Sequence, residues 1–124
     1  IISFILILVT ASSVLAHEMT PTYPELRPSY LDGLNSAKMS IFNRRNDAIY
    51  YEIKVFGGEW NPIPFASQER IMKVNYLERK TFEVYVREAD AKNVEYICTI
   101  SKLTKNSNNN SMIASKICSK IKRD

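Results

Sequence analysis

The chain has 124 residues, a length that suits one domain. Its 17 basic and 13 acidic residues give a net charge of +4, with many of the basic residues near the C-terminus. A basic tail can bind nucleic acid, anionic lipid or a partner's carboxylate, but a solvated surface is the simpler interpretation and we expect no nucleic-acid partner. The sequence has a single histidine and no glycine-rich phosphate loop, nucleophile elbow or calcium loop. We therefore expect neither an enzyme nor a bound cofactor.

Residues 1–16 have the features of a secretory signal peptide. The segment carries no charge, is mostly apolar and ends in the small-residue pattern Val14-x-Ala16. Since no basic n-region precedes it, we expect an N-terminally truncated signal peptide followed by one domain over residues 17–124. The alternative is an uncleaved membrane anchor, which would be the only membrane contact, although spanning a bilayer takes about twenty apolar residues. The prediction is an exported protein, periplasmic or extracellular.

After residue 16 the recurring hydrophobic period is two, the period of strands with one face in a core. In chain order the predicted strands are residues 20–27, 37–41, 49–56, 71–76, 81–87, 96–103 and 112–121. Turn signals such as Asp32-Gly33 and Gly57-Gly58 separate them. Residues 88–93 predict a short helical turn, and the polar stretch 104–111 predicts a loop that does not pack. The rhythm predicts an all-β fold, an immunoglobulin-like β-sandwich of about seven strands.

The alternating runs also predict which side chains form the core. β-Branched and aromatic residues fill these runs, as half-buried pleated surfaces favour. The expected core residues are Ile41, Ile53, Val55, Phe82, Val84 and Ile100. Between two of the strands, Pro62 and Pro64 predict an irregular connection, and the neighbouring Trp60 belongs either to an exposed contact patch or to the end of the core.

Cys98 and Cys118 are the only cysteines. In an exported protein a single pair predicts a disulfide, which here would join the last two strands. Closing a loop of about twenty residues stabilises a fold by roughly 3 kcal/mol on the chain-entropy model. A metal site is the alternative, but no further ligands stand at a useful spacing, so we expect none.

His17 would become the first residue after cleavage. An amino-terminal histidine can chelate copper through its amine and its imidazole, but Met19 alone cannot replace the further ligands that such a site needs. Copper sites of this kind recruit further histidines, and this chain has none. An exported copper-binding sandwich is therefore the most distant hypothesis.

Several short stretches carry a family resemblance. They are Leu26-Arg27-Pro28-Ser29-Tyr30-Leu31-Asp32-Gly33, Ala37-Lys38-Met39-Ser40-Ile41-Phe42-Asn43, the segment 74–86, Glu95-Tyr96-Ile97 and Lys120-Ile121-Lys122. In these stretches the chain resembles the first domain of periplasmic pilus-assembly chaperones, the PapD-like family. The likeness covers about two-thirds of the chain, from Tyr23 to Lys102, and each motif is short.

The resemblance implies that the last strand binds a partner. In the family this strand pairs with an incomplete subunit by β-strand addition, in which backbone hydrogen bonds give affinity and alternate side chains give specificity. An arginine and a lysine grip the subunit's terminal carboxylate. Lys122 falls where that lysine stands, while Arg27 lies one position from the arginine and Pro28 occupies its place.

Spacing within the last predicted strand separates its two faces. Ile113, Ile117 and Ile121 are an even number of residues apart and share one face. Lys120 and Lys122 lie on the other face, where their charge would protect the edge and meet a partner's carboxylate.

The leading hypothesis is therefore a non-enzymatic, exported, chaperone-like module that pairs a protein partner, such as a pilus or surface subunit, through its last strand. The alternative is a structural or adhesive immunoglobulin-like protein of a cell surface or a phage virion.

Overall fold

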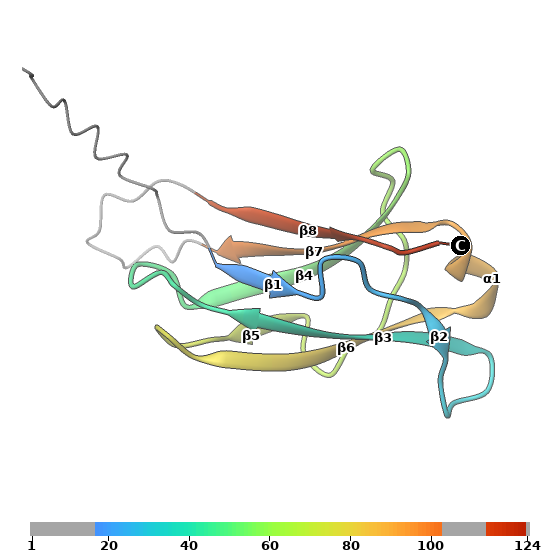
Figure 1. Cartoon of the computed structure of the whole chain (residues 1–124), viewed down its shortest axis with the longest axis horizontal. Helices are drawn as coiled ribbons and strands as arrows, with labels where there is room; N and C mark the ends of the chain where they lie inside the picture. The colour runs from blue at the N-terminus through green and yellow to red at the C-terminus, as the bar shows by residue number, and fades with distance from the viewer. Residues whose placement is uncertain (1–16, 103–113, 124) are drawn as a thin grey trace, which may run out of the picture.

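The computed structural model describes residues 17–102 and 114–123, which form two antiparallel β-sheets around one core (Figure 1). The all-β, immunoglobulin-like sandwich predicted from the sequence is confirmed. The predicted signal peptide and the residue Ile113 lie outside the described residues. Within those ranges, no helix is long and apolar enough to cross a membrane.

The first sheet is built around its longest strand. Its members are β1 (Glu18–Thr20), β2 (Arg27–Pro28), β3 (Leu34–Phe42) and β6 (Arg79–Arg87). One edge of β3 pairs with β6 along its whole length, while β1 and β2 share the other edge. The predicted opening strand over 20–27 is therefore wrong as a single element. Pro21 and Pro24 lie between β1 and β2, and proline has no N–H with which to continue a ladder.

The second sheet has the order β5-β4-β7-β8. These strands are β4 (Tyr50–Gly57), β5 (Ile71–Lys73), β7 (Val94–Lys102) and β8 (Lys116–Lys120). The strand predicted over 71–76 is shorter than expected, and the predicted helical turn is α1 (Glu88–Ala91). β8 is the outermost strand of this sheet on one side, so one of its two edges faces away from β7.

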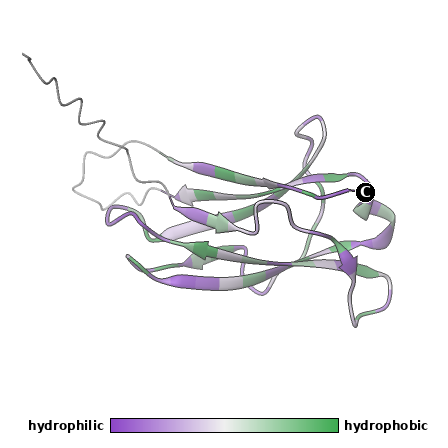
Figure 2. Cartoon of the chain, in the orientation of Figure 1, coloured by the Kyte–Doolittle hydropathy of each residue, from purple (hydrophilic) through white to green (hydrophobic). Residues whose placement is uncertain are grey.

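The core lies between the sheets, where hydrophobic residues alternate with hydrophilic ones along the strands (Figure 2). Five of the expected core residues are buried: Ile41, Ile53, Val55, Phe82 and Val84. The sixth expectation, Ile100, is wrong. Ile97 and Thr99 point into the sandwich, so Ile100 stands on the opposite face of β7 and is only half-buried. The apolar run around Ile97 and Ile100 has no clean period of two, and the register across β7 and β4 decides which isoleucine is inside.

The predicted disulfide between Cys98 and Cys118 is present. The two residues stand directly opposite each other in the β7–β8 ladder, with a Cα–Cα distance of 4.1 Å. This separation is typical of the non-hydrogen-bonded pairs of an antiparallel ladder, whose side chains are closest. The disulfide therefore ties the edge strand β8 to the sheet interior without using its outward backbone groups.

Candidate partner-binding site

Among the described residues, no strand pairs with the outer edge of β8. The Ile121 amide donates to the Glu95 carbonyl at 2.8 Å, and the Ser101 amide donates to the Ser115 carbonyl at 2.9 Å. Hydrogen-bonded pairs recur at every second residue in an antiparallel ladder, so odd-numbered residues of β8 use their backbone groups toward β7. Even-numbered residues must then direct theirs away from the sheet. β1 lies beside this edge but pairs with β3.

The outward-pointing backbone belongs to Lys116, Cys118 and Lys120. At the end of the same edge the Lys122 amide donates to the Pro24 carbonyl at 2.8 Å. The segment after β1 thus occupies the last position of the edge, and no described strand pairs with the three preceding positions.

The isoleucine face of β8 divides between the core and the surface. Ile121 is buried in the core, and Ser119 is also buried. Ile117 is only half-buried, although it packs against the core. Ile113, the third member of the predicted face, lies outside the described residues. Of the isoleucines predicted to contact a partner, Ile117 is therefore partly accessible, whereas Ile121 lies in the interior.

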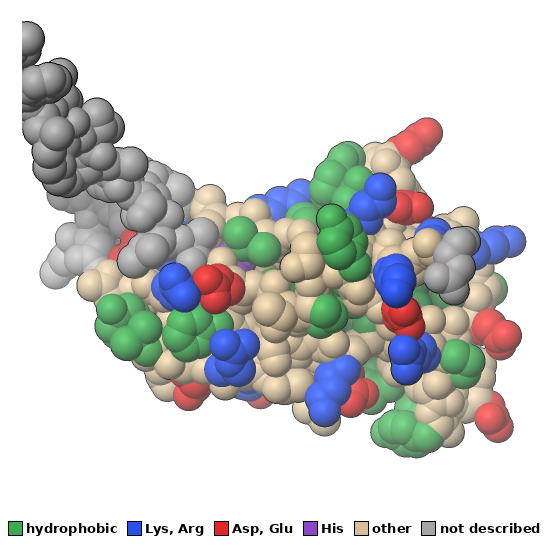
Figure 3. All heavy atoms as spheres, in the orientation of Figure 1, with side chains coloured by type: hydrophobic (Ala, Val, Ile, Leu, Met, Phe, Trp, Pro, Cys, Tyr) green, Lys and Arg blue, Asp and Glu red, His purple; other side chains and the backbone are tan. Residues whose placement is uncertain are grey.

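Basic side chains flank the outward edge. Lys116, Lys120 and Lys122 are exposed, as the alternation predicted. The Lys116 ammonium lies 4.7 Å from the Phe56 ring centre and 4.5 Å from that of Trp60. Trp60 in turn stacks on Tyr96 with ring centres 4.1 Å apart. On the face shown in Figure 3, basic and acidic side chains are interspersed.

The family resemblance predicted that Arg27 and Lys122 hold a carboxylate. In the structure both side chains contact the carboxylate of Glu25. Glu25 Oε2 accepts from Arg27 Nη2 at 2.7 Å and from Arg27 Nε at 3.0 Å. Glu25 Oε1 lies 3.5 Å from Lys122 Nζ. The hydrogen bonds from Arg27, followed by the charge of Arg27 and the contact with Lys122, lower the pKa of Glu25. The two basic groups therefore form a site of the right charge and reach for one carboxylate group.

A hollow surrounds this carboxylate site. Its volume is about 450 Å³, and it is lined by Pro21, Tyr23, Pro24, Glu25, Arg27, Ser36, Lys38 and Lys122. Sequence reasoning identified Arg27 and Lys122 but missed Glu25, Lys38 and Pro24. Glu25 stands two residues from Arg27, and this spacing, which places both side chains on one face of an extended segment, is the signal that could have identified it.

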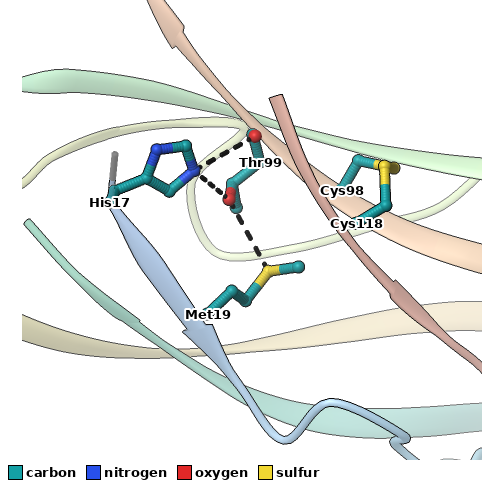
Figure 4. Close-up of a disulfide and its surroundings, with 5 residues drawn as sticks. All are labelled: His17, Met19, Cys98, Thr99 and Cys118. Carbon is teal, nitrogen blue, oxygen red and sulfur yellow. Dashed lines mark hydrogen bonds between the residues drawn. A yellow bond between two sulfur atoms is a disulfide. The ribbon is translucent and has the colours of Figure 1, made fainter. Parts of the chain in front are cut away.

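At the other end of β8, His17 is held inside the sandwich (Figure 4). Its Nε2 lies 2.8 Å from Thr99 Oγ1 and 3.2 Å from the Thr99 carbonyl, which can only accept. Nε2 therefore carries the proton, and Nδ1 accepts from the Ser115 hydroxyl at 3.0 Å. Burial lowers the pKa of His17 to about 4, against the opposing effect of the Thr99 carbonyl and with a contribution from the Arg45 charge.

This arrangement bears on the copper hypothesis. Both ring nitrogens of His17 are engaged in hydrogen bonds, so neither offers a free lone pair to a metal. The Met19 side chain also contacts Thr99, whose hydroxyl donates to the Met19 sulfur at 3.6 Å. Within residues 17–102 and 114–123 no group of three or more histidine, cysteine or acidic side chains could hold a metal ion. The residues around His17 build a hydrogen-bonded core contact.

A larger buried polar network adjoins His17. Arg45 Nη1 donates to Ser101 Oγ at 3.1 Å, while its Nε and Nη2 donate to the Asp47 carboxylate at 2.8 and 2.7 Å. Asn43 is fully buried and donates to the Ala48 and Val74 carbonyls. It also accepts from the Tyr51 hydroxyl at 2.6 Å. Burial is the main cause that raises the pKa of Tyr51 to about 12. Neither Asn43 nor Arg45 was predicted to be interior.

Comparison with known proteins supports the fold. No protein-family model and no curated protein matches the chain. Among solved structures, the crystal structure of the E. coli chaperone DraB matches with a TM-score of 0.65 and 12% sequence identity. The match covers 86% of this chain but 53% of DraB, so the chain spans about half the length of that protein. At this identity the likeness establishes a shared fold, and the resemblance to chaperone domains predicted from the sequence is confirmed at that level.

Proposed function

We propose that this protein is a non-enzymatic, chaperone-like binding module that captures a protein partner by β-strand addition at the outer edge of β8. The observation that carries the proposal is the row of outward backbone groups at Lys116, Cys118 and Lys120, with which no described strand pairs. Unpaired edges of this kind recruit an extended segment from another chain. The shared fold with the chaperone DraB is consistent with this role.

Arg27 and Lys122 give the proposed partner a direction. They lie beyond the C-terminal end of β8 and hold one carboxylate between them. A partner whose terminal carboxylate is bound there must run parallel to β8, with its preceding residues along the outward edge. Its alternate side chains would then contact Ile117 on one face and the lysines on the other.

The charge of the edge disfavours pairing between two copies of this chain. Lys116 and Lys120 would meet the same lysines of a second β8, and like charges across a ladder are destabilising. A neutral or acidic strand from a different protein fits better. The disulfide supports an oxidising compartment for this encounter, which agrees with the expected export to the periplasm or the extracellular space.

The test uses an N-acetylated octapeptide of alternating valine and threonine with a free C-terminus. The peptide should slow hydrogen exchange at the amides of Lys116, Cys118 and Lys120, measured by NMR. In Lys120→Pro one outward donor is lost while the inner ladder remains, because proline is tolerated where its nitrogen faces solvent. We expect this variant to bind about fivefold more weakly than Lys120→Ala, the size of one lost hydrogen bond.

Lys120→Ala is the matched control, since it removes the charge but keeps the amide. Ser119→Pro is the opposite control, because its nitrogen faces β7 and its loss should lower the melting temperature. Equal peptide affinities for Lys120→Pro and Lys120→Ala, with no protection of the three amides, would contradict strand addition at β8.

A further inference from the structure

The segment Pro24–Glu25 occupies the end of the β8 edge in the way a bound chain terminus would. The Pro24 carbonyl accepts the outward amide of Lys122 at 2.8 Å, as the backbone of an added strand would do. The next residue, Glu25, places its carboxylate between Arg27 and Lys122. A bound chain terminus would present the same two groups. Its backbone carbonyl would accept a hydrogen bond from the strand edge, and its terminal carboxylate would lie between the two cations.

The ion pairs that hold Glu25 are exposed and therefore exchangeable. The side chains of Glu25, Arg27 and Lys122 are 40%, 76% and 57% exposed. Pairs in such positions are weak because water and salt screen them. A competing carboxylate can displace Glu25 without breaking any part of the hydrophobic core.

The hollow around Glu25 also favours an incoming anion. Three basic side chains line it, namely Arg27, Lys38 and Lys122, against the single acid Glu25. Lys38 has no ion pair among the described residues. The hollow keeps an excess of positive charge while Glu25 is bound, so a second carboxylate is attracted before the first one leaves.

From these contacts we propose that Glu25 is an internal competitor of the partner, which it excludes from the Arg27–Lys122 site until a chain ending in a free carboxylate displaces it. The inference rests on the proposed function, because it assigns a regulatory role at the same edge. A partner with a blocked C-terminus gains nothing from displacing Glu25 and binds through the backbone ladder alone. Arg27 and Lys122 select for a free C-terminal carboxylate, and competition from Glu25 weakens the binding of a partner that carries one.

The experiment compares the valine–threonine octapeptide as its free acid and as its C-terminal amide. In Glu25→Gln the side chain keeps its shape and loses its charge. We expect this variant to bind the free acid about two- to fivefold more tightly than the wild-type protein, the range of an exposed ion pair. Its affinity for the amide should stay unchanged.

Glu69→Gln is the matched control. It makes the same change in net charge and breaks a similar exposed pair, in which Lys80 Nζ lies 3.0 Å from Glu69 Oε2. Glu69 precedes β5, at the other side of the sheet from β8. Tighter binding of the free acid in Glu25→Gln but not in Glu69→Gln supports the inference. A gain of equal size in both variants assigns the effect to net charge and overturns it.

The remaining outcomes separate this inference from the proposed function. If the peptides protect the β8 amides but Glu25→Gln binds the free acid no better than the wild type, strand addition stands and the competitor role fails. If neither peptide binds any variant and the β8 amides stay unprotected, both proposals fail together.

Discussion

Two polar regions lie at opposite ends of β8 and differ in burial. At one end His17, Arg45 and Ser115 are linked inside the sandwich by hydrogen bonds. At the other end Glu25, Arg27 and Lys122 meet in solvent. Both regions contain a basic residue paired with an acid, since Arg45 binds Asp47 as Arg27 binds Glu25.

The difference in burial separates the two roles. The Arg45 side chain is 4% exposed, so removing its partners would strand a charge in a medium that cannot solvate it. The Arg27 side chain is exposed, and water replaces any partner it loses. The buried region is therefore tied to the stability of the fold, while the exposed region is free to exchange one carboxylate for another.

The largest expected effect on the free energy of unfolding comes from a substitution in the buried region. Arg45→Leu removes the charge that satisfies Asp47 and the serines, and we expect it to lower the free energy of unfolding by about 3–5 kcal/mol. Arg27→Leu, its exposed counterpart, should change that free energy by less than about 0.5 kcal/mol. Urea denaturation of both variants measures the two values. Losses of equal size would remove the distinction between the regions.

The next effect is a pH dependence of the buried region. Because the pKa of His17 is about 4 when folded and 6.5 as a free side chain, the unfolded chain binds the proton first as pH falls. The contribution of the neutral ring is complete above pH 6.5 and is lost between about 6.5 and 4, with a total of about 3 kcal/mol.

Urea denaturation at intervals between pH 7.5 and 4.5 should reveal this loss in the wild-type protein. His17→Gln has no titrating ring and should lack that component. Glu25 has a lowered pKa, so its contribution is present above its ordinary value of 4.5 and lost below it, outside most of this window. A wild-type slope that matches His17→Gln would show that His17 is not buried as a neutral ring.

The smallest effect concerns one hydroxyl. Tyr51→Phe removes the hydrogen bond to Asn43 Oδ1, which keeps a second donor in the Arg45 amide. We expect a loss of about 1 kcal/mol. Tyr23→Phe changes an exposed tyrosine in the hollow and should leave the melting temperature within experimental error. Equal melting temperatures for the two variants would mean that the Tyr51 hydroxyl is not part of a stabilising network.

Much of the fold could be predicted because strands with one face in a core leave a period of two in the sequence. This period located β3, β4 and β6, and the two cysteines predicted the disulfide. It failed at Ile100, where two isoleucines three residues apart left the inward face undecided. It also failed at Asn43 and Arg45, whose residue types indicate a solvated turn, although the structure buries both.

The sequence by itself determined the all-β class and the alternating core faces, because both depend on a local hydrophobic period. It also determined the pairing of Cys98 with Cys118, because two cysteines can form only one disulfide within the chain. The family resemblance of the sequence also identified Arg27 and Lys122 as candidate carboxylate-binding residues. Only the tertiary structure decided that Glu25 joins them and that Pro24 closes the end of the β8 edge, since Lys122 lies far along the chain from both. It likewise decided which polar groups are buried, because that depends on whether distant strands supply hydrogen-bond partners, as Thr99 and Ser115 do for His17.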